Sequence, residues 1–370
     1  MPKTRITRLR LADLRNYASL RIDFDAPFVV FTGANGAGKT NLLEAISLMT
    51  PGRGLRRAVQ ADIARAGGSG GFSIFAEVER DTETVALATL VRPDAPSRIV
   101  RINETAASAE ELLDHLRLVW LTPAMDGLFT GPAADRRRFL DRLVLALDPA
   151  HGRRAADYEK AMRGRNRLLD ENRMDDAWLT GIEAQMAELG VAMALARAEV
   201  VGLLGALIDA GPEEAPFPRA GLALSSGYGF DDLSGSAVEL EDRAARHLRE
   251  GRYGDRAAGR TLEGPHRADL AVSYIAKAMP AALSSTGEQK ALLIGLILAH
   301  ARLVASVGGI VPVLLLDEIA AHLDPGRRAA LFDIIEALGA QAFMTGTDAS
   351  LFEALEGRAQ RLTVSNGSLA

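Results

Sequence analysis

The segment Gly33–Thr40 reads GANGAGKT and matches the phosphate-loop pattern Gly-x-x-x-x-Gly-Lys-[Ser/Thr] at every fixed position. It stands between an apolar run, APFVVFT, and a helical pattern, NLLEAISLM, as such a loop requires. The glycines let backbone N–H groups surround phosphate oxygens, and the N-terminus of the next helix adds its positive end. We expect Lys39 to reach the β- and γ-phosphates of ATP, and Thr40 to offer its hydroxyl to Mg²⁺. The residues expected to bind the nucleotide are Gly33, Ala34, Asn35, Gly36, Ala37, Gly38, Lys39, Thr40 and Asn41.

The phosphate loop needs an acidic segment opposite it, because Mg²⁺ beside such a loop must be held from both sides. The apolar run VPVLLL ends in Asp317 and Glu318, a pattern typical of a buried strand. We expect Asp317 to join Thr40 as a metal ligand, directly or through water. Glu318, with Lys39, is the expected catalytic residue, since its carboxylate could polarise the attacking water as a general base. A strand that merely enters a loop is the alternative for this segment alone.

The segment STGEQK, residues 285–290, precedes the apolar run ALLIGLILAHARL. Ser285 and Glu288 form a capping-box pattern, in which two side chains satisfy two backbone donors, and this pattern alone implies no chemistry. The order of the motifs, however, resembles the head of ABC-type ATPases: phosphate loop, long insertion, Ser-x-Gly-Glu-Gln, then Asp-Glu. This resemblance implies that Ser285, Gly287 and Glu288 act in trans on the ATP of a second subunit.

Asp324 begins a further helical pattern, DPGRRAALFDIIEAL, as the N-cap residue before Pro325. By the same resemblance, Asp324 lies in the D-loop across the interface between two subunits. Thr345 or Thr347 would occupy the switch position, where many transporters have histidine.

Strand patterns dominate the first hundred residues and return near the end of the chain. The expected strands lie in residues 7–14, 20–24, 26–33, 71–80, 83–93, 97–104, 268–275, 308–318, 341–348 and 360–369. The expected fold is α/β: an ABC-type ATPase head, with a phosphate-loop core and an antiparallel β subdomain, from residues 1–107 and 258–370. An inserted helical arm domain is predicted at residues 108–257.

Helical patterns fill most of this insertion. The expected helices lie in residues 109–120, 134–147, 158–172 and 178–209. In the longest, apolar residues recur at steps of three or four from Trp178 to Leu207, which favours packing within a helix bundle. An open, dimerising coiled coil is the alternative.

Composition excludes several classes of protein. The chain has 370 residues, 48% of them hydrophobic, which suits one large or two coupled domains. It has no cysteine and six scattered histidines, so disulfides and thiolate metal sites are excluded and zinc is disfavoured. No run of about 18 uncharged apolar residues and no secretory signal is present. We therefore expect a cytoplasmic protein without a membrane partner.

The net charge of −5 hides an asymmetry. Residues 136–173 contain 11 Arg or Lys against 6 Asp or Glu, whereas residues 174–257 contain 7 against 15. The basic block is either a solvated helix face that pairs with its acidic neighbour or a stripe that binds nucleic-acid phosphates.

Several stretches, in order along the chain, carry a resemblance that runs nearly end to end: LRNYASLRIDF, GANGAGKTNLLEAI, RRRFLDR, GPHRADL, STGEQKALL and LLLDEIAAHLD. Together they resemble the RecF family of bacterial recombination mediators, in the SMC/Rad50-like group. The family implies an ATP-dependent homodimer with weak, DNA-stimulated ATPase activity. It would bind DNA at gaps and single-strand/double-strand junctions, help RecR and RecO to load RecA, and release DNA on hydrolysis. Recombination, replication-fork maintenance and the SOS response are the implied processes.

The arginines of the basic block are the predicted DNA contacts, chiefly through phosphates. They are Arg136, Arg137, Arg138, Arg153, Arg154, Arg163, Arg165 and Arg167, with Arg53, Arg56 and Arg57 as second choices.

The ATPase subunit of a membrane transporter is the main competing hypothesis, because it shares all three motifs. The long helical insertion and the threonine at the switch position count against it. A longer structural-maintenance ATPase would need a longer insertion, and a non-catalytic scaffold would not need Lys39, Asp317 and Glu318 together.

Overall fold

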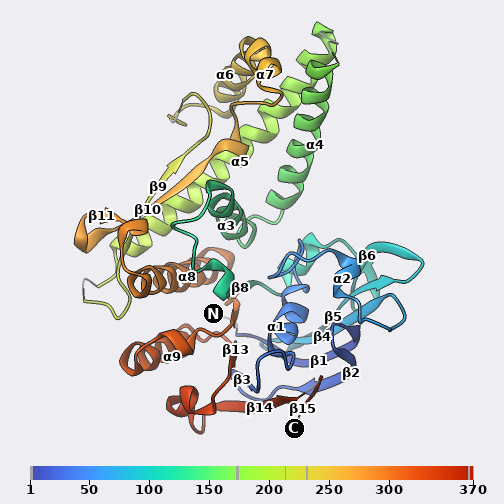
Figure 1. The fold of residues 1–370 in the computed structure, drawn as a ribbon, viewed down its shortest axis with the longest axis vertical. Coiled ribbons are helices and arrows are strands. Elements are labelled where there is room, and N and C mark those ends of the chain that lie inside the picture. The colour runs from blue at the N-terminus through green and yellow to red at the C-terminus, as the bar shows by residue number, and fades with distance from the viewer. Residues whose placement is uncertain (1–2, 172–174, 213, 231, 366, 370) are drawn as a thin grey trace. The chain divides into compact units, whose positions relative to one another are not determined.

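The computed structural model describes residues 3–171, 175–212, 214–230, 232–365 and 367–369, without the side chains of residues 96 and 322. The chain forms two compact units (Figure 1). The first unit comprises Met1–Asp126, Glu213–Pro218 and Ser285–Ala370, and the second comprises Gly127–Pro212 and Arg219–Ser284.

A six-stranded sheet in the order β15-β14-β3-β13-β12-β8 forms one layer of the first unit. Its strands are β3 (Phe28–Thr32), β8 (Leu118–Leu121), β12 (Val313–Leu316), β13 (Ala342–Gly346), β14 (Ala359–Ser365) and β15 (Ser368–Leu369). The strands from β14 to β8 pair in parallel, and β15 is antiparallel to β14. Since parallel strands end at the same edge of a sheet, the segments after β3 and β12 meet there.

A second sheet of the first unit is antiparallel throughout, in the order β2-β1-β4-β5-β6-β7. Its strands are β1 (Thr4–Leu14), β2 (Tyr17–Asp23), β4 (Phe72–Arg80), β5 (Glu83–Arg92), β6 (Ala95–Ile102) and β7 (Thr105–Ala107). The helices of this unit are α1 (Lys39–Ser47), α2 (Gln60–Ile63), α8 (Thr286–Gly308) and α9 (Pro325–Leu338).

Helix α1 joins the two sheets through one hydrophobic core. Its Leu42, Leu43 and Ile46 are fully buried in a cluster that also contains Ile74 of β4 and Phe343 of β13. A helix that is apolar on most faces is stable only when it is covered on those faces. The burial of α1 therefore fixes the position of the loop that precedes it.

The second unit combines helices with a three-stranded antiparallel sheet, β11-β10-β9. Its elements are α3 (Ala133–Leu145), α4 (His151–Asp170), α5 (Asp176–Asp209), β9 (Ala220–Ser225), α6 (Ala237–Glu250), α7 (Arg252–Ala258), β10 (Asp269–Tyr274) and β11 (Met279–Pro280). Helix α5 packs against α4, α6 and β9. Short 3-10 helices lie in Glu110–Asp114, Pro123–Met125, Pro265–Arg267, Ile275–Lys277, Ala281–Leu283, Ala320–His322 and Ala349–Leu355.

The helix expected at residues 109–120 is wrong. Only Glu110–Asp114 forms a 3-10 turn, and Leu118–Leu121 is strand β8, paired in parallel with β12. Every residue of β8 is buried, so this short apolar run lacks the alternation that identifies a half-exposed strand. Strand β9 was also missed, because its residues lie in a region whose general pattern is helical.

The long helix is confirmed as α5, but its buried stripe differs from the predicted one. Trp178 is 67% exposed and Leu203 is 40% exposed, whereas the neighbouring Leu179 and Leu204 are buried. The packing of α4 and α6 on this helix decides which of several apolar residues face inward.

The domain division predicted from the sequence stays a proposal. Two pairings bear on it: β8, expected in the arm, joins the sheet of the first unit, and β10, expected in the head, pairs with β9 in the second unit. The unit to which each of these strands belongs depends on its pairing with a distant segment. The periodicity of the sequence does not reveal such pairing.

Two described helices, α5 and α8, have the length and hydropathy of a membrane span. The apolar window of α8 is 72% buried inside the fold and that of α5 is 33% buried. Core helices of soluble proteins meet the same criteria, and α5 carries the buried charged residues Glu183 and Arg197.

Candidate nucleotide-binding site

The phosphate loop connects the end of β3 to the first turn of α1, as predicted. Two of its glycines are required by geometry. Gly33 has φ +144° and a Cβ there would lie 2.3 Å from the Val364 carbonyl oxygen; Gly38 has φ +115° and a Cβ would lie 2.4 Å from Asn16 Nδ2. These φ values disfavour any L side chain, so the close approaches and the backbone path together demand glycine.

The side chain of Lys39 turns back into the phosphate loop. Its side chain is 4% exposed, and its ammonium donates to the carbonyl oxygens of Gly33 at 2.7 Å and Ala34 at 2.9 Å. A buried ammonium held by neutral carbonyls is a concentrated positive charge at the position where the motif requires one.

Thr40, Asp317 and Thr345 form one hydrogen-bonded group that joins α1, β12 and β13. The Thr40 hydroxyl donates to Asp317 Oδ1 at 2.9 Å, and the Thr345 hydroxyl donates to the same oxygen at 2.7 Å. Asp317 is 6% exposed and Thr345 is fully buried. A hydroxyl and a carboxylate are the hard oxygen ligands that Mg²⁺ prefers, so these residues fit the predicted metal.

Glu318 has a strained backbone. Its φ is +52°, unusual for a residue other than glycine, and its N–H donates to the Thr345 hydroxyl at 2.9 Å. Its side chain is half-buried and makes no hydrogen bond or ion pair to any residue that the structure describes. Strained residues of this kind are concentrated at functional sites.

The sequence interpretation missed the support beneath the loop, which comes from the LRNY segment. Tyr17 donates to the Gly38 carbonyl at 3.1 Å, and Asn16 donates to the Ala37 carbonyl at 3.0 Å. Burial raises the pKa of the Tyr17 phenol, so it stays a donor. The resemblance of the LRNY segment to the family was a signal in the sequence, but only the fold places this segment under the loop.

Arg15 and Glu44 fasten the same segment to α1. Two guanidinium nitrogens of Arg15 each lie 2.7 Å from a carboxylate oxygen of Glu44, which is fully buried. Arg56 adds a third contact at 3.2 Å to Glu44. Arg56, a second-choice DNA contact, therefore pairs with Glu44 within the unit.

The STGEQK segment forms the predicted capping box at the start of α8. Ser285 accepts from the Glu288 N–H at 3.4 Å, and Glu288 accepts from the Ser285 N–H at 3.0 Å. Ser285 and Gly287 are exposed. Among the described residues, the Ser285 hydroxyl bonds to Glu288 and not to the phosphate loop. Asp324 is exposed too and caps α9 by accepting from Arg327 N–H at 2.9 Å.

The predicted DNA contacts in the second unit fall into different environments. Arg136 forms a two-bonded ion pair with Asp269, at 2.7 and 2.8 Å, and Arg137 donates to the Ala268 carbonyl at 2.9 Å. Arg138 and Arg154 pair with nearby aspartates. Arg153 lies 3.8 Å from the Asp157 carboxylate, and its side chain is 81% exposed.

The prediction for Arg165 is wrong. Its side chain is fully buried and forms ion pairs with Glu183 at 3.0 Å and Asp255 at 2.6 Å. Sequence alone did not reveal this, because both carboxylates come from other helices.

In the GPHRADL motif, His266 is half-buried beside Tyr158 of α4, whereas Arg267 is exposed. His266 Nε2 lies 3.0 Å from the Thr261 carbonyl and Nδ1 lies 3.1 Å from the Tyr158 hydroxyl. A carbonyl only accepts, so Nε2 carries the proton and Tyr158 donates to Nδ1. Burial lowers the pKa of His266, which keeps the ring neutral.

Comparison with known proteins supports this assembly of motifs. The family model described as RecF/RecN/SMC N terminal domain matches residues 5–368. A protein of Mesorhizobium japonicum named DNA replication and repair protein RecF is 62% identical over 370 residues, covering 99% of this chain and 98% of that protein. The chain belongs to the RecF family. A RecF protein of Rhizobium etli is 60% identical over 370 residues, covering 99% of each.

Solved structures show that the fold is that of RecF. A structure described as the recombination mediator protein RecF-ATPrS in the RecFOR pathway gives a TM-score of 0.88 at 20% identity, covering 99% of this chain and 98% of that one. The Smc head domain of Pyrococcus furiosus, bound to the C-terminal domain of ScpA, gives 0.53 at 17% identity and covers 100% of this chain and 95% of that one. The predicted fold class, an ABC-type ATPase head with an inserted helical region, is confirmed.

Proposed function

We propose that this chain is an ATP-hydrolysing, DNA-binding protein of recombinational repair and replication. Membership of the RecF family and relatives named for DNA replication and repair support the process. The contact of Thr40 with Asp317 carries the chemical part of the proposal, because it joins the phosphate loop to an acidic strand end across 277 positions of sequence.

Each residue of the site has a separate role in hydrolysis. Loop N–H groups and Lys39 bind the ATP phosphates, and Thr40 with Asp317 holds Mg²⁺, which neutralises charge on the β- and γ-phosphates when it is bound. Glu318 orients the attacking water and accepts its proton. Thr345 positions both acidic residues, since it bonds to the Asp317 carboxylate and to the Glu318 backbone.

A second copy of the chain completes the site. Ser285, Gly287 and Glu288, with the N-terminus of the 23-residue helix α8, contact the γ-phosphate bound to the partner, and Asp324 lies across the same interface. The exposure of Ser285 and Asp324 supports this role, because an exposed helix end is free to meet another molecule.

The dimer is the form of the protein that binds DNA. ATP closes two copies around DNA at a gap or a single-strand/double-strand junction, and hydrolysis, which is slow and stimulated by DNA, releases it. The exposed Arg153 and its basic neighbours contact phosphates. RecR and RecO are the expected partners in loading RecA, and solved relatives are described as part of a RecFOR pathway. The expected location is the cytoplasm, with α5 and α8 as core helices rather than membrane spans.

The decisive experiment measures ATPase rate against protein concentration, with and without gapped DNA. A rate that rises with the square of concentration and is stimulated by DNA supports the shared site. Lys39→Met should abolish ATP binding. Ser285→Arg should keep ATP binding but lose dimerisation and hydrolysis, whereas Ser306→Arg, at the other end of α8, should change neither. Monomeric Ser285→Arg protein with the wild-type DNA-stimulated rate would refute the trans site.

A further inference from the structure

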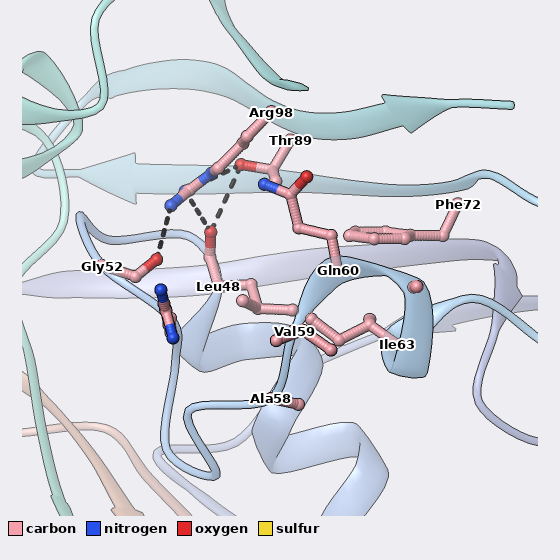
Figure 2. A pocket seen from close by; sticks show the side chains of 11 residues that line it. Leu48, Gly52, Ala58, Val59, Gln60, Ile63, Phe72, Thr89 and Arg98 are labelled. Carbon is pink, nitrogen blue, oxygen red and sulfur yellow. Dashed lines mark hydrogen bonds between the residues drawn. The ribbon is translucent and has the colours of Figure 1, made fainter. Parts of the chain in front are cut away.

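A pocket lies at the C-terminal end of α1, whereas the phosphate loop lies at the N-terminal end of that helix. Its volume is about 340 Å³, and it is lined by residues of α2, the loop after α1, and strands β4, β5 and β6 (Figure 2). This volume lies at the lower end of the range of sites for small ligands. At ~1.5 Å per residue, the nine residues of α1 place the two sites roughly 13 Å apart along the helix.

One part of the pocket is apolar. Leu48, Ile63 and Phe72 are buried side chains in its wall, and Val59 is 52% exposed beside them. An aromatic ring and branched side chains around a hollow form a surface suited to a flat, apolar face of a ligand. An exposed valine at the same place gains free energy when a ligand covers it.

The other part of the pocket is cationic. Arg98 donates to the carbonyl oxygens of Thr50 at 2.9 Å and Gly52 at 3.2 Å, to the Leu48 carbonyl, and to the Thr89 hydroxyl at 3.1 Å. Figure 2 shows Arg98 and Thr89 at one end and Phe72 and Ile63 at the other.

All these acceptors are neutral, and no carboxylate of the described residues forms an ion pair with Arg98. Burial lowers the pKa of this guanidinium to about 10, against the opposing effect of Glu110. A half-buried cation without a counter-ion favours an anion beside it.

The rim adds further positive charge. Arg53, Arg56 and Arg57 are exposed in the loop after α1; Arg56 pairs with Glu44, and Arg53 lines the pocket. Arg53 forms no ion pair with any described residue. An apolar wall, a cationic end and a basic rim match a nucleotide, which has a flat base and a phosphate group.

We propose that this pocket binds one unpaired nucleotide of single-stranded DNA, with its base against Phe72 and Ile63 and its phosphate beside Arg53 and Arg98. The proposal rests on the proposed binding of DNA by this chain. It gives the first unit its own means of detecting a single-stranded segment beside a duplex. A free nucleoside monophosphate has the same chemistry and is distinguished by the experiment below.

The test compares the affinity of the protein for a blunt duplex and for the same duplex with a single-stranded tail of thymidines. Binding is measured by fluorescence anisotropy at fixed salt, with a saturating non-hydrolysable ATP analogue to occupy the phosphate loop. Ala61→Trp fills the pocket from an exposed lining residue, and Ala106→Trp, on β7 outside the pocket, is its control. Arg53→Gln removes the rim charge, and Arg101→Gln is its control.

Wild-type protein should bind the tailed duplex more tightly, and Ala61→Trp should lose about tenfold for the tailed duplex alone. Arg53→Gln should lose part of the same preference, and both controls should keep it. Pocket variants that keep the full wild-type preference for the tail would overturn the proposal. So would binding of dTMP to the pocket without any preference for tails. If wild-type protein binds neither duplex, the proposed DNA-binding function itself fails.

Discussion

Replacement of Thr345 by valine isolates the contact that joins the two acidic residues of the site. Valine has nearly the shape of threonine, so the fully buried position stays filled. The change removes the donor to Asp317 Oδ1 at 2.7 Å and the acceptor of the Glu318 N–H at 2.9 Å. Thr40 continues to donate to Asp317 at 2.9 Å, so the carboxylate keeps one of its two hydroxyl partners.

The expected loss of stability follows from these two bonds. A hydrogen bond to a charged group contributes about 1.5–3 kcal/mol, and a buried N–H left without a partner costs about 1–3 kcal/mol. Because the two effects share one side chain and are not additive, we expect the free energy of unfolding to fall by about 3 kcal/mol. The Glu318 backbone, at φ +52°, loses the hydrogen bond that holds it. The general base should therefore shift, and kcat should fall about 100-fold.

Chemical denaturation and steady-state ATPase assays measure the two effects. Thr345→Ser keeps the hydroxyl and should retain most of kcat, at a cost of about 1 kcal/mol for the lost methyl group. Thr347→Val is the matched control, because Thr347 is exposed on the following segment. If Thr345→Val hydrolyses ATP at the wild-type rate, Thr345 does not position the general base; a loss of activity in Thr347→Val instead would place Thr347 at the switch position.

Three further predictions concern the loop and the second unit. Gly38→Ala should weaken ATP binding at least tenfold in a titration, because a Cβ would meet Asn16 Nδ2 at 2.4 Å; wild-type affinity would contradict the required φ. Arg165→Met leaves two buried carboxylates without this partner and should destabilise the protein by about 3–5 kcal/mol in calorimetry, an effect that a DNA-contact role would not produce. Burial lowers the pKa of His266, so the unfolded chain binds a proton more readily and stability should fall as the pH drops below about 6.5. His266→Gln should flatten this pH dependence in denaturant titrations, and an unchanged slope would exclude His266 as its source.

Local pattern predicted most of the first unit correctly. The phosphate loop, α1 and the strand before them are contiguous, so their geometry depends on neighbours in sequence. The capping box of α8 and the N-cap of α9 are likewise confirmed, since each joins residues three apart. Strand β8 was misassigned because its identity depends on pairing with β12, about two hundred positions later.

The arginines of the basic block show the limit of reasoning from composition. A count of charges predicts a basic stripe, but it cannot say which guanidinium already has a partner. Arg136 pairs with Asp269, 133 positions away, and Arg165 pairs with Asp255, 90 positions away. These pairings neutralise charge that the sequence suggested was available to DNA.

By itself, the sequence determined the residue types of the nucleotide site and their order along the chain, because the phosphate loop and the acidic strand end are short local patterns. Only the tertiary structure decided what surrounds them: Tyr17 under Gly38, Thr345 against Asp317, and, at the far end of α1, Arg98 bonded to neutral acceptors. The physical reason is that hydrogen bonds and burial act over a few ångströms of space. The sheet order, rather than the distance along the chain, determines which side chains come that close.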